Sequence, residues 1–170
     1  MDPASHVRTG RLILRPVAPA DLADLVPFKA DPRAFALVLG GVRSPEQTAR
    51  ELAEDIAFWG ARGYGMWTVR DVRDDAFLGI TGLMERADGR GVALRFAFRP
   101  DVRGRGYASE AAGAALRFAH ERAGLTCVVA VAKEINIASR QVLGAIGMCR
   151  CDAFDRDGER MLVYESVRSP

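Results

Sequence analysis

Residues 103–110 read Arg103-Gly104-Arg105-Gly106-Tyr107-Ala108-Ser109-Glu110 and join a predicted strand to a predicted helix. Two glycines in such a place allow a tight turn and a close approach of the backbone to a ligand. The following helix points its unpaired N–H groups and the positive end of its dipole back into the turn. Two arginines add positive charge, so the stretch predicts a binding site for a phosphate or pyrophosphate.

Two common phosphate-binding loops do not match this stretch. The Lys-Ser/Thr ending of a nucleoside-triphosphate loop is missing, and a dinucleotide fingerprint requires its third glycine where the chain has Ser109. A tight turn with solvated arginines is the alternative interpretation of the same residues.

Length and composition favour one ordinary domain over residues 1–170. The chain has 170 residues, of which 49% are apolar, and this is enough for a single core. The net charge is only +2, and acidic and basic residues are interspersed, so nothing indicates a nucleic-acid surface or a basic membrane patch. We find neither a signal-peptide core nor an apolar run long enough for a membrane span, and we expect a cytoplasmic protein.

The three cysteines favour a reduced protein without a metal site. Cys127, Cys149 and Cys151 are odd in number and lie in apolar, strand-like sequence, so we expect them in the core. The spacing of the cysteines relative to His6 and His120 matches no zinc pattern, and we expect no metal.

The first third of the chain predicts one strand followed by helices. The strand covers residues 7–15, and a short helix with Pro19 in its first turn follows, with Pro27 marking a limit or a kink. Another turn can start at Asp31-Pro32, and the region up to Gly40-Gly41 stays unassigned. A Ser-x-x-Gln capping box then predicts a helix over residues 45–62, whose apolar face we expect in the core.

The remaining sequence predicts a meander, a crossover and a terminal hairpin. Residues 66–69, 77–84 and 92–98 indicate three antiparallel strands. A helix over residues 108–123 then connects the third strand to a strand over residues 126–131, and these two strands should be parallel. Asn136 opens the last helix, and two strands over residues 148–154 and 161–166 form a hairpin.

Three motifs resemble the GCN5-related N-acetyltransferase (GNAT) family. Arg103, Gly106 and Ala108 match the Arg/Gln-x-x-Gly-x-Gly/Ala motif, whose loop binds the pyrophosphate of acetyl-CoA in that family. The run Thr9-Gly10-Arg11-Leu12-Ile13-Leu14-Arg15 is similar to the Thr-x-Arg-Leu-x-Leu-Arg opening of the RimJ/RimL branch. Asn136-x-x-Ser139 precedes Gly147-Met148 where that branch has Gly-Phe. The predicted elements also follow the family's order along nearly the whole chain.

The resemblance implies an α/β (α+β) fold of GNAT type. Its central, twisted, mixed sheet of seven strands would be largely antiparallel, with one parallel pair splayed around the cofactor and about four flanking helices. The main chain of the third meander strand would pair with the pantetheine arm, and Asn136 and Ser139 would contact the same arm. The hydroxyl of Ser139 would lie near the sulfur and act in catalysis. The expected cofactor-binding residues are Phe96, Ala97, Phe98, Arg103, Gly104, Arg105, Gly106, Tyr107, Ala108, Ser109, Asn136 and Ser139.

The chain departs from the family at the catalytic positions. Many relatives carry a glutamate near Ala93 or near Val131, and a tyrosine at the position of Leu143. The nearest carboxylates in strand order are Glu85 and Glu134, which we interpret as solvated charges at strand ends. The sequence therefore identifies no general base.

The expected function is that of an acetyl-CoA-dependent N-acetyltransferase whose acceptor is a primary amine. The amine would attack the thioester directly, with no metal ion, and the protein would be a monomer or a homodimer. A peptide N-terminus, a metabolite and an antibiotic all remain open as acceptors. A domain that senses acyl-CoA or another nucleotide without turnover is the main alternative, and an ATP-dependent enzyme is disfavoured because the loop has no lysine.

Overall fold

A computed structural model describes residues 2–169, and these residues form one sheet of eight strands. The strand order is β1-β2-β3-β4-β5-β6-β8-β7, and only β5 and β6 are parallel neighbours. This confirms the expected mixed, largely antiparallel sheet. The strands are β1 (Val7–Arg8), β2 (Leu12–Pro16), β3 (Met66–Asp71), β4 (Phe77–Glu85), β5 (Val92–Phe98), β6 (Cys127–Lys133), β7 (Cys149–Arg156) and β8 (Glu159–Val167).

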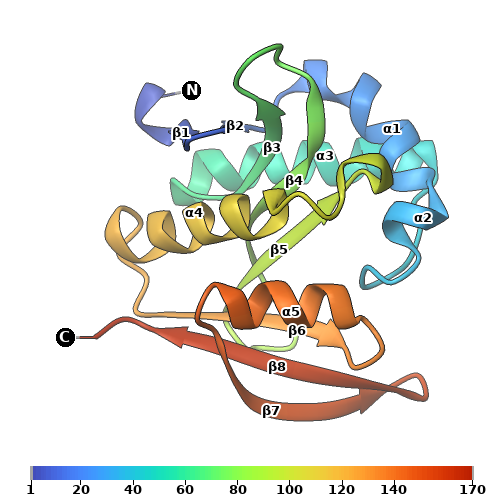
Figure 1. The fold of residues 1–170 in the computed structure, drawn as a ribbon, viewed down its shortest axis with the longest axis vertical. Helices are drawn as coiled ribbons and strands as arrows, with labels where there is room; N and C mark the ends of the chain where they lie inside the picture. Colours follow the sequence, from blue (N-terminus) through green and yellow to red (C-terminus); the bar gives the residue numbers. More distant parts are fainter. Residues whose placement is uncertain (1, 170) are drawn as a thin grey trace.

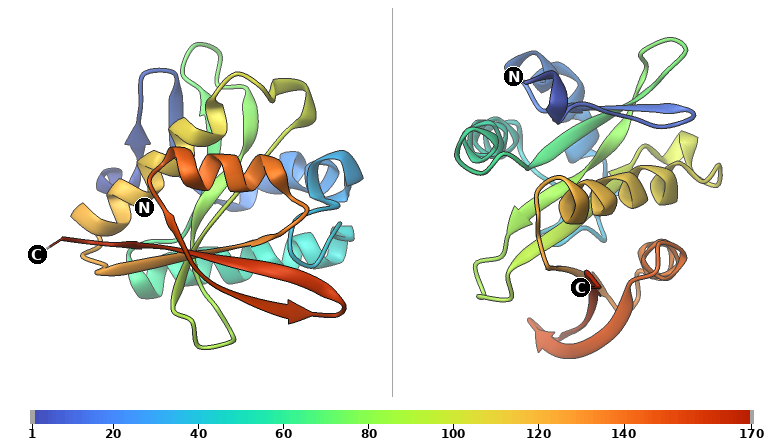
Figure 2. Two further views of the ribbon diagram at one scale, coloured as in Figure 1. Left: turned by 60° about the horizontal axis from the view of Figure 1, so that its bottom comes forward. Right: turned by 90° about the vertical axis from the view of Figure 1, so that its left-hand side faces the viewer.

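Helices cover both faces of the sheet. The views in Figure 2 place α3 on one face and α4 with α5 on the other, while α1 packs against α3. Short 3₁₀ turns precede β1, α1 and α4. The helices are α1 (Leu22–Ala30), α2 (Pro32–Phe35), α3 (Pro45–Arg62), α4 (Tyr107–Glu121) and α5 (Ile137–Ala145).

The capping box at the start of α3 forms as predicted. The backbone N–H of Gln47 donates to Ser44 Oγ at 3.1 Å, and the backbone N–H of Ser44 donates to Gln47 Oε1 at 2.8 Å. Trp59 is 2% exposed and donates its indole N–H to the carbonyl of Met66 at 2.6 Å. The apolar face of α3 therefore belongs to the core, which leaves the polar residues beside that face available for the site.

The sheet has eight strands where seven were expected, because the first predicted strand is a hairpin of two strands, β1 and β2. Val7 pairs with Leu14 across a turn, and the backbone N–H of Thr9 donates to the carbonyl of Leu12 at 2.9 Å. Thr9 Oγ1 accepts from the N–H of Leu12 at 3.1 Å, so a threonine side chain and Gly10 together close the turn. Residues 7–15 alternate well enough to conceal this reversal.

The region before Gly40-Gly41, which the sequence left unassigned, contains a fifth helix where about four helices were expected. Asp31 caps the short helix α2, because its side chain accepts from the N–H of Arg33 at 2.9 Å. Helix α1 continues past Pro27 to Ala30. The buried side chains of Leu25 and Phe28 anchor α1 on either side of that proline, so tertiary packing holds a segment that the proline weakens.

The expectation of buried cysteines is wrong. Cys127, Cys149 and Cys151 are all free and exposed. Cys149 and Cys151 lie on β7, which is the edge strand of the sheet and is exposed along most of its length. A register shift between Arg150 and Asp152 marks a bulge at Cys151. The edge position, which strand propensity does not reveal, explains the error.

Candidate active site

The site is organised by the splay between the parallel strands β5 and β6. The two strands pair only at Ala93 and Val129, and Figure 1 shows them diverging from each other. The backbone N–H of Arg99 donates to the carbonyl of Leu78, so the odd-numbered residues of β5 bond to β4. By alternation, the N–H and C=O of Phe96 face β6, where no ladder partner exists among residues 2–169.

A cavity of about 810 Å³ follows this splay. Residues of α3 and β5 line one part of it, and residues of β6 and α5 line another. The cavity brings together four of the residues expected to contact the cofactor, which are Phe96, Ala97, Asn136 and Ser139. Phe98 and residues 103–109 do not line the cavity, since they lie beyond it at the end of β5.

The loop at residues 103–109 presents a run of free backbone donors. Gly104 and Gly106 both adopt φ +79°, and Gly106 caps α4 without offering a side-chain oxygen. Within the described part of the chain, the six N–H groups of residues 104–109 have no acceptor. Six free donors at the positive end of a 15-residue helix favour the binding of an anion. The assignment of this loop to pyrophosphate binding stays a prediction.

Some side chains of the loop have structural partners. Arg103 Nη2 donates to the carbonyl of Phe98 at 3.4 Å, which turns the guanidinium back towards β5. Arg11 Nη1 donates to the carbonyl of Arg105 at 2.9 Å, and the Arg11 guanidinium lies 4.5 Å from the centre of the Tyr107 ring. The Tyr107 side chain therefore packs against Arg11, while its backbone N–H is one of the free donors of the loop.

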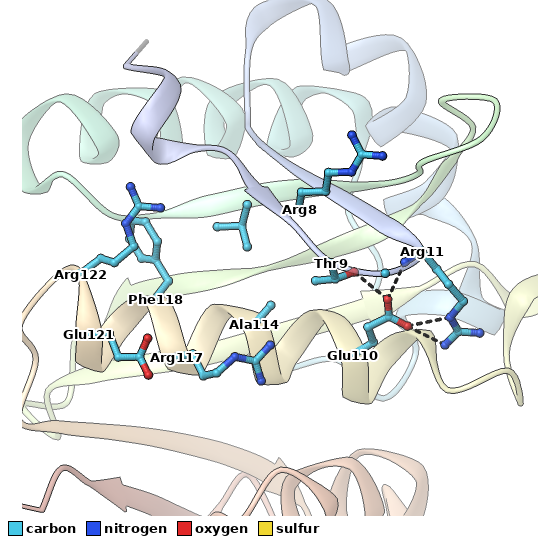
Figure 3. A pocket seen from close by; sticks show the side chains of 11 residues that line it. Arg8, Thr9, Arg11, Glu110, Ala114, Arg117, Phe118, Glu121 and Arg122 are labelled. Carbon is cyan, nitrogen blue, oxygen red and sulfur yellow. Dashed lines mark hydrogen bonds and ion pairs between the residues drawn. The ribbon is translucent and has the colours of Figure 1, made fainter.

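The N-terminal hairpin holds this loop in place, a role that the sequence did not reveal. Glu110, in the first turn of α4, accepts from Thr9 Oγ1 at 2.6 Å and from Arg11 Nε at 2.7 Å (Figure 3). Burial alone raises the pKa of Glu110, but the bonds from Thr9 and Arg11 outweigh it and leave that pKa below its ordinary value. The carboxylate is therefore a fixed anchor for Arg11.

Asn136 and Ser139 lie together at the start of α5. Asn136 Oδ1 accepts from the backbone N–H of Ser139 at 3.2 Å, so Asn136 caps α5. The hydroxyl of Ser139 has no hydrogen-bond partner in the described chain, and Ser139 lines the cavity. It is therefore free to donate to a ligand.

The residues at the family's usual catalytic positions supply no acid or base. Leu143 is 1% exposed and lines the cavity where relatives place a tyrosine. Glu85 pairs with Arg62 at 2.8 Å, and Glu134 lies 3.7 Å from Arg160. Both carboxylates are about half exposed, which agrees with solvated charges at strand ends.

Asp55 is a cavity carboxylate that the sequence did not single out. It lies on α3, one turn after Glu51, and lines the cavity. Burial raises the pKa of Asp55 to about 6, although the charge of Lys29 acts in the opposite direction. The only available signal was the spacing of Glu51 and Asp55 beside the apolar face, and acids at such positions usually face solvent.

Comparison with known proteins identifies the family. Residues 11–149 match the sequence model described as "Acetyltransferase (GNAT) domain". The chain belongs to the GNAT acetyltransferase family. Family members are acetyltransferases of the N-acetyltransferase class, so the resemblance to the GNAT family is confirmed over most of the chain.

Solved GNAT structures superpose on nearly all of this chain. An acetyltransferase from Agrobacterium tumefaciens str. C58 is 30% identical, with a TM-score of 0.85 over 96% of this chain and 94% of the other. A putative GNAT-family acetyltransferase from Bordetella pertussis is 23% identical, with a TM-score of 0.83 over 94% and 98%. The ribosomal L7/L12 alpha-N-protein acetyltransferase RimL, in complex with coenzyme A, is 15% identical, with a TM-score of 0.77 over 95% and 97%.

The described GNAT domain has neither a metal cluster nor a membrane-spanning helix. Residues 2–169 contain no group of three histidine, cysteine, aspartate or glutamate side chains placed to hold a metal ion. None of the helices in this part of the chain is both long and apolar enough to cross a membrane.

Proposed function

We propose that the protein is an acetyl-CoA-dependent N-acetyltransferase that acetylates a primary amine by direct attack on the thioester. The observation that carries the proposal is the run of six unpaired N–H groups at residues 104–109, next to the unpaired edge of β5. Thr9, Arg11, Asn136 and Ser139 support an assignment to the RimJ/RimL-like branch.

The residues present suit the parts of acetyl-CoA. The N–H groups of residues 104–109 would bind the pyrophosphate, assisted by the dipole of α4. The N–H and C=O of Phe96 would pair with the amide groups of pantetheine, which need partners when they leave water. Acetyl-CoA would supply an activated acetyl group as a thioester, and no metal is required for its transfer.

Ser139 and Asn136 would have different tasks. Direct transfer by the neutral amine forms a C–N bond and breaks the C–S bond, while negative charge develops on sulfur. The nitrogen loses one proton to water, and the leaving sulfur takes one up to give the free thiol of coenzyme A. The free hydroxyl of Ser139 would donate to that sulfur, while Asn136 would keep Ser139 in place through its bond to the Ser139 N–H. Most of the remaining rate enhancement would come from alignment of the amine with the thioester.

Thiol release on addition of amines tests the proposal. The purified protein is mixed with acetyl-CoA and a panel of peptide N-termini, metabolite amines and antibiotic amines, and free thiol and acetylated product are measured. We expect product from at least one class, together with a rise in melting temperature on adding acetyl-CoA alone. A protein that acetyl-CoA stabilises but that acetylates no amine in the panel would instead be a sensor.

A further inference from the structure

Arg95 is the one cation of the cavity without an acidic partner among residues 2–169. It extends from β5, and its only side-chain hydrogen bond is from Nη1 to Met84 Sδ at 3.0 Å. The other cations of the cavity all lie within 4.0 Å of a carboxylate. These are Lys29, Arg43, Arg86 and Arg156.

The surroundings of Arg95 make an uncompensated charge costly. Burial, and then the charge of Arg43, lower the pKa of Arg95, while Glu51 and Asp55 act in the opposite direction. A guanidinium nevertheless stays protonated in proteins, so a partly buried one requires an anion or water around it. Ala93 and Ala97 flank Arg95 on the same face of β5 and also line the cavity, and their small side chains leave room for a ligand there.

Among the described acids of the cavity, Asp55 is the partly buried carboxylate that lacks a cationic partner, just as Arg95 lacks an acidic one. Glu51, Glu85, Asp88 and Asp155 each have a cation within 4.0 Å. Two have no cation that close among residues 2–169; Glu54 is exposed, whereas Asp55 is partly buried on α3. Asp55 and Arg95 each influence the pKa of the other, but no ion pair joins them at 4.0 Å or less. A partly buried carboxylate and guanidinium therefore share one cavity without neutralising each other.

We propose that the acceptor is an amine that also carries a carboxylate, with its ammonium group on Asp55 and its carboxylate on Arg95. A guanidinium binds a carboxylate through two parallel hydrogen bonds, which gives it both strength and direction. A free amino acid and a peptide N-terminus followed by an acidic residue share this chemistry. The proposal rests on the proposed acetyl transfer and narrows its substrate class.

The test compares matched acceptors on the whole protein. The first arm uses ω-amino acids from glycine to 6-aminohexanoate, each against the alkylamine and the diamine of the same length. The second arm uses short peptides that differ only by glutamate or glutamine after the N-terminal alanine. The parent should prefer the acid over the neutral partner by roughly ten- to a hundred-fold in kcat/KM in one arm, and the successful arm identifies the source.

Variants test whether Arg95 causes the preference for acidic acceptors. Arg95→Gln should lower the acid-to-neutral ratio of kcat/KM to about one, and Arg95→Glu should shift the preference towards the diamine. The matched control Arg156→Gln removes an equal charge from the same cavity and should leave the ratio unchanged. Equal rates for acid and neutral acceptors with the parent, or an unchanged ratio in Arg95→Gln, would overturn the proposal.

A binding measurement separates this proposal from the proposed function. Calorimetry with the preferred acid, in the presence of coenzyme A without an acetyl group, needs no turnover. The acid should bind to the parent and roughly ten- to a hundred-fold more weakly to both Arg95→Gln and Asp55→Asn. If the acid binds in this way but no amine is acetylated, the enzymatic function would be wrong and the recognition site would stand. If the protein acetylates an amine but binding of the acid does not depend on Arg95, the enzymatic function would stand and the recognition site would be wrong.

Discussion

Arg11 and Glu110 lie 99 positions apart in the chain and meet through three contacts. The Arg11 backbone N–H donates to Glu110 Oε1 at 3.0 Å, and its Nε and Nη2 each lie 2.7 Å from Oε2. The same arginine donates to the carbonyl of Arg105. One side chain thus connects the N-terminal hairpin, the loop at residues 103–109 and the first turn of α4.

Replacing Glu110 by glutamine should loosen this connection. We expect Glu110→Gln to lower the free energy of unfolding at pH 7 by about 1–2 kcal/mol, because charge-assisted bonds from Thr9 and Arg11 are lost. The pKa of Glu110 is lowered on folding, so its contribution is present above the unfolded value of 4.5 and is lost as pH falls. Urea titrations at pH 7 and pH 3 measure both effects. A difference between variant and parent that is equally large at pH 3 would contradict this.

The substitution Gly106→Val should abolish cofactor binding. Gly106 has φ +79°, so a branched side chain there strains the turn, and its Cβ would lie 3.5 Å from Arg11 Nη2. Acetyl-CoA should raise the melting temperature of the parent but not of this variant. Gly124→Val is a matched control, because Gly124 has φ +71° at the other end of α4. A normal thermal shift in folded Gly106→Val would show that the loop is not the binding site.

Ser139→Ala should affect turnover more than binding. The developing thiolate exists only as the C–S bond breaks, so a hydrogen bond to it is strongest in the transition state. We expect single-turnover transfer to slow by roughly ten- to a hundred-fold, with little change in the acetyl-CoA affinity measured by calorimetry. Asn136→Ala should mainly weaken that affinity, because we also expect Asn136 to contact the pantetheine arm. Equal losses of rate and affinity in Ser139→Ala would assign Ser139 a purely structural role.

Asp55→Asn should stabilise the protein at alkaline pH. The pKa of Asp55 rises from 3.8 to about 6 on folding, so the folded state holds its proton more tightly. Stability from this group is present at low pH and is lost as pH rises between about 4 and 6, by at most about 3 kcal/mol. Charge on Lys29, Glu51, Glu54 and Arg95 modulates this transition. Thermal unfolding at pH 4 and pH 8 should show a gain for the variant only at pH 8, and a loss there would refute the expectation.

The cysteines should be dispensable for acetyl transfer. Direct attack needs no acyl-enzyme, and all three thiols are exposed. We expect the triple variant Cys127→Ser, Cys149→Ser, Cys151→Ser to keep turnover within about two-fold of the parent. If a folded variant that binds acetyl-CoA normally loses turnover, a covalent intermediate would replace direct attack.

Local signals account for most of the fold. The capping box at Ser44 and the helix stop at Gly63 depend on residues next to them, and the structure reproduces both. The hairpin at Gly10 was missed because strand alternation continues on both sides of the turn. The exposure of Cys149 and Cys151 follows from the position of β7 in the sheet, which depends on pairing between distant segments.

The site was predictable where backbone conformation carries the chemistry. Gly104 and Gly106 indicate the tight turn before α4, because positive φ values favour glycine. Arg11 and Glu110, by contrast, meet only in the folded chain. Asp55 and Arg95 are ordinary charged residues of a helix and a strand, and only the cavity shows which of them have no partner.

The single bridge between β5 and β6 divides the sheet into two hydrogen-bonded lobes, β1–β5 and β6–β8. The packing of α4 against α5 and the shared apolar core connect these lobes. A ligand whose amide groups pair in the splay would act as an inserted strand and complete the ladder across the domain. Binding would then make the two lobes unfold as one cooperative unit, and the slowing of amide hydrogen exchange would extend along both strands well beyond the atoms that the ligand touches.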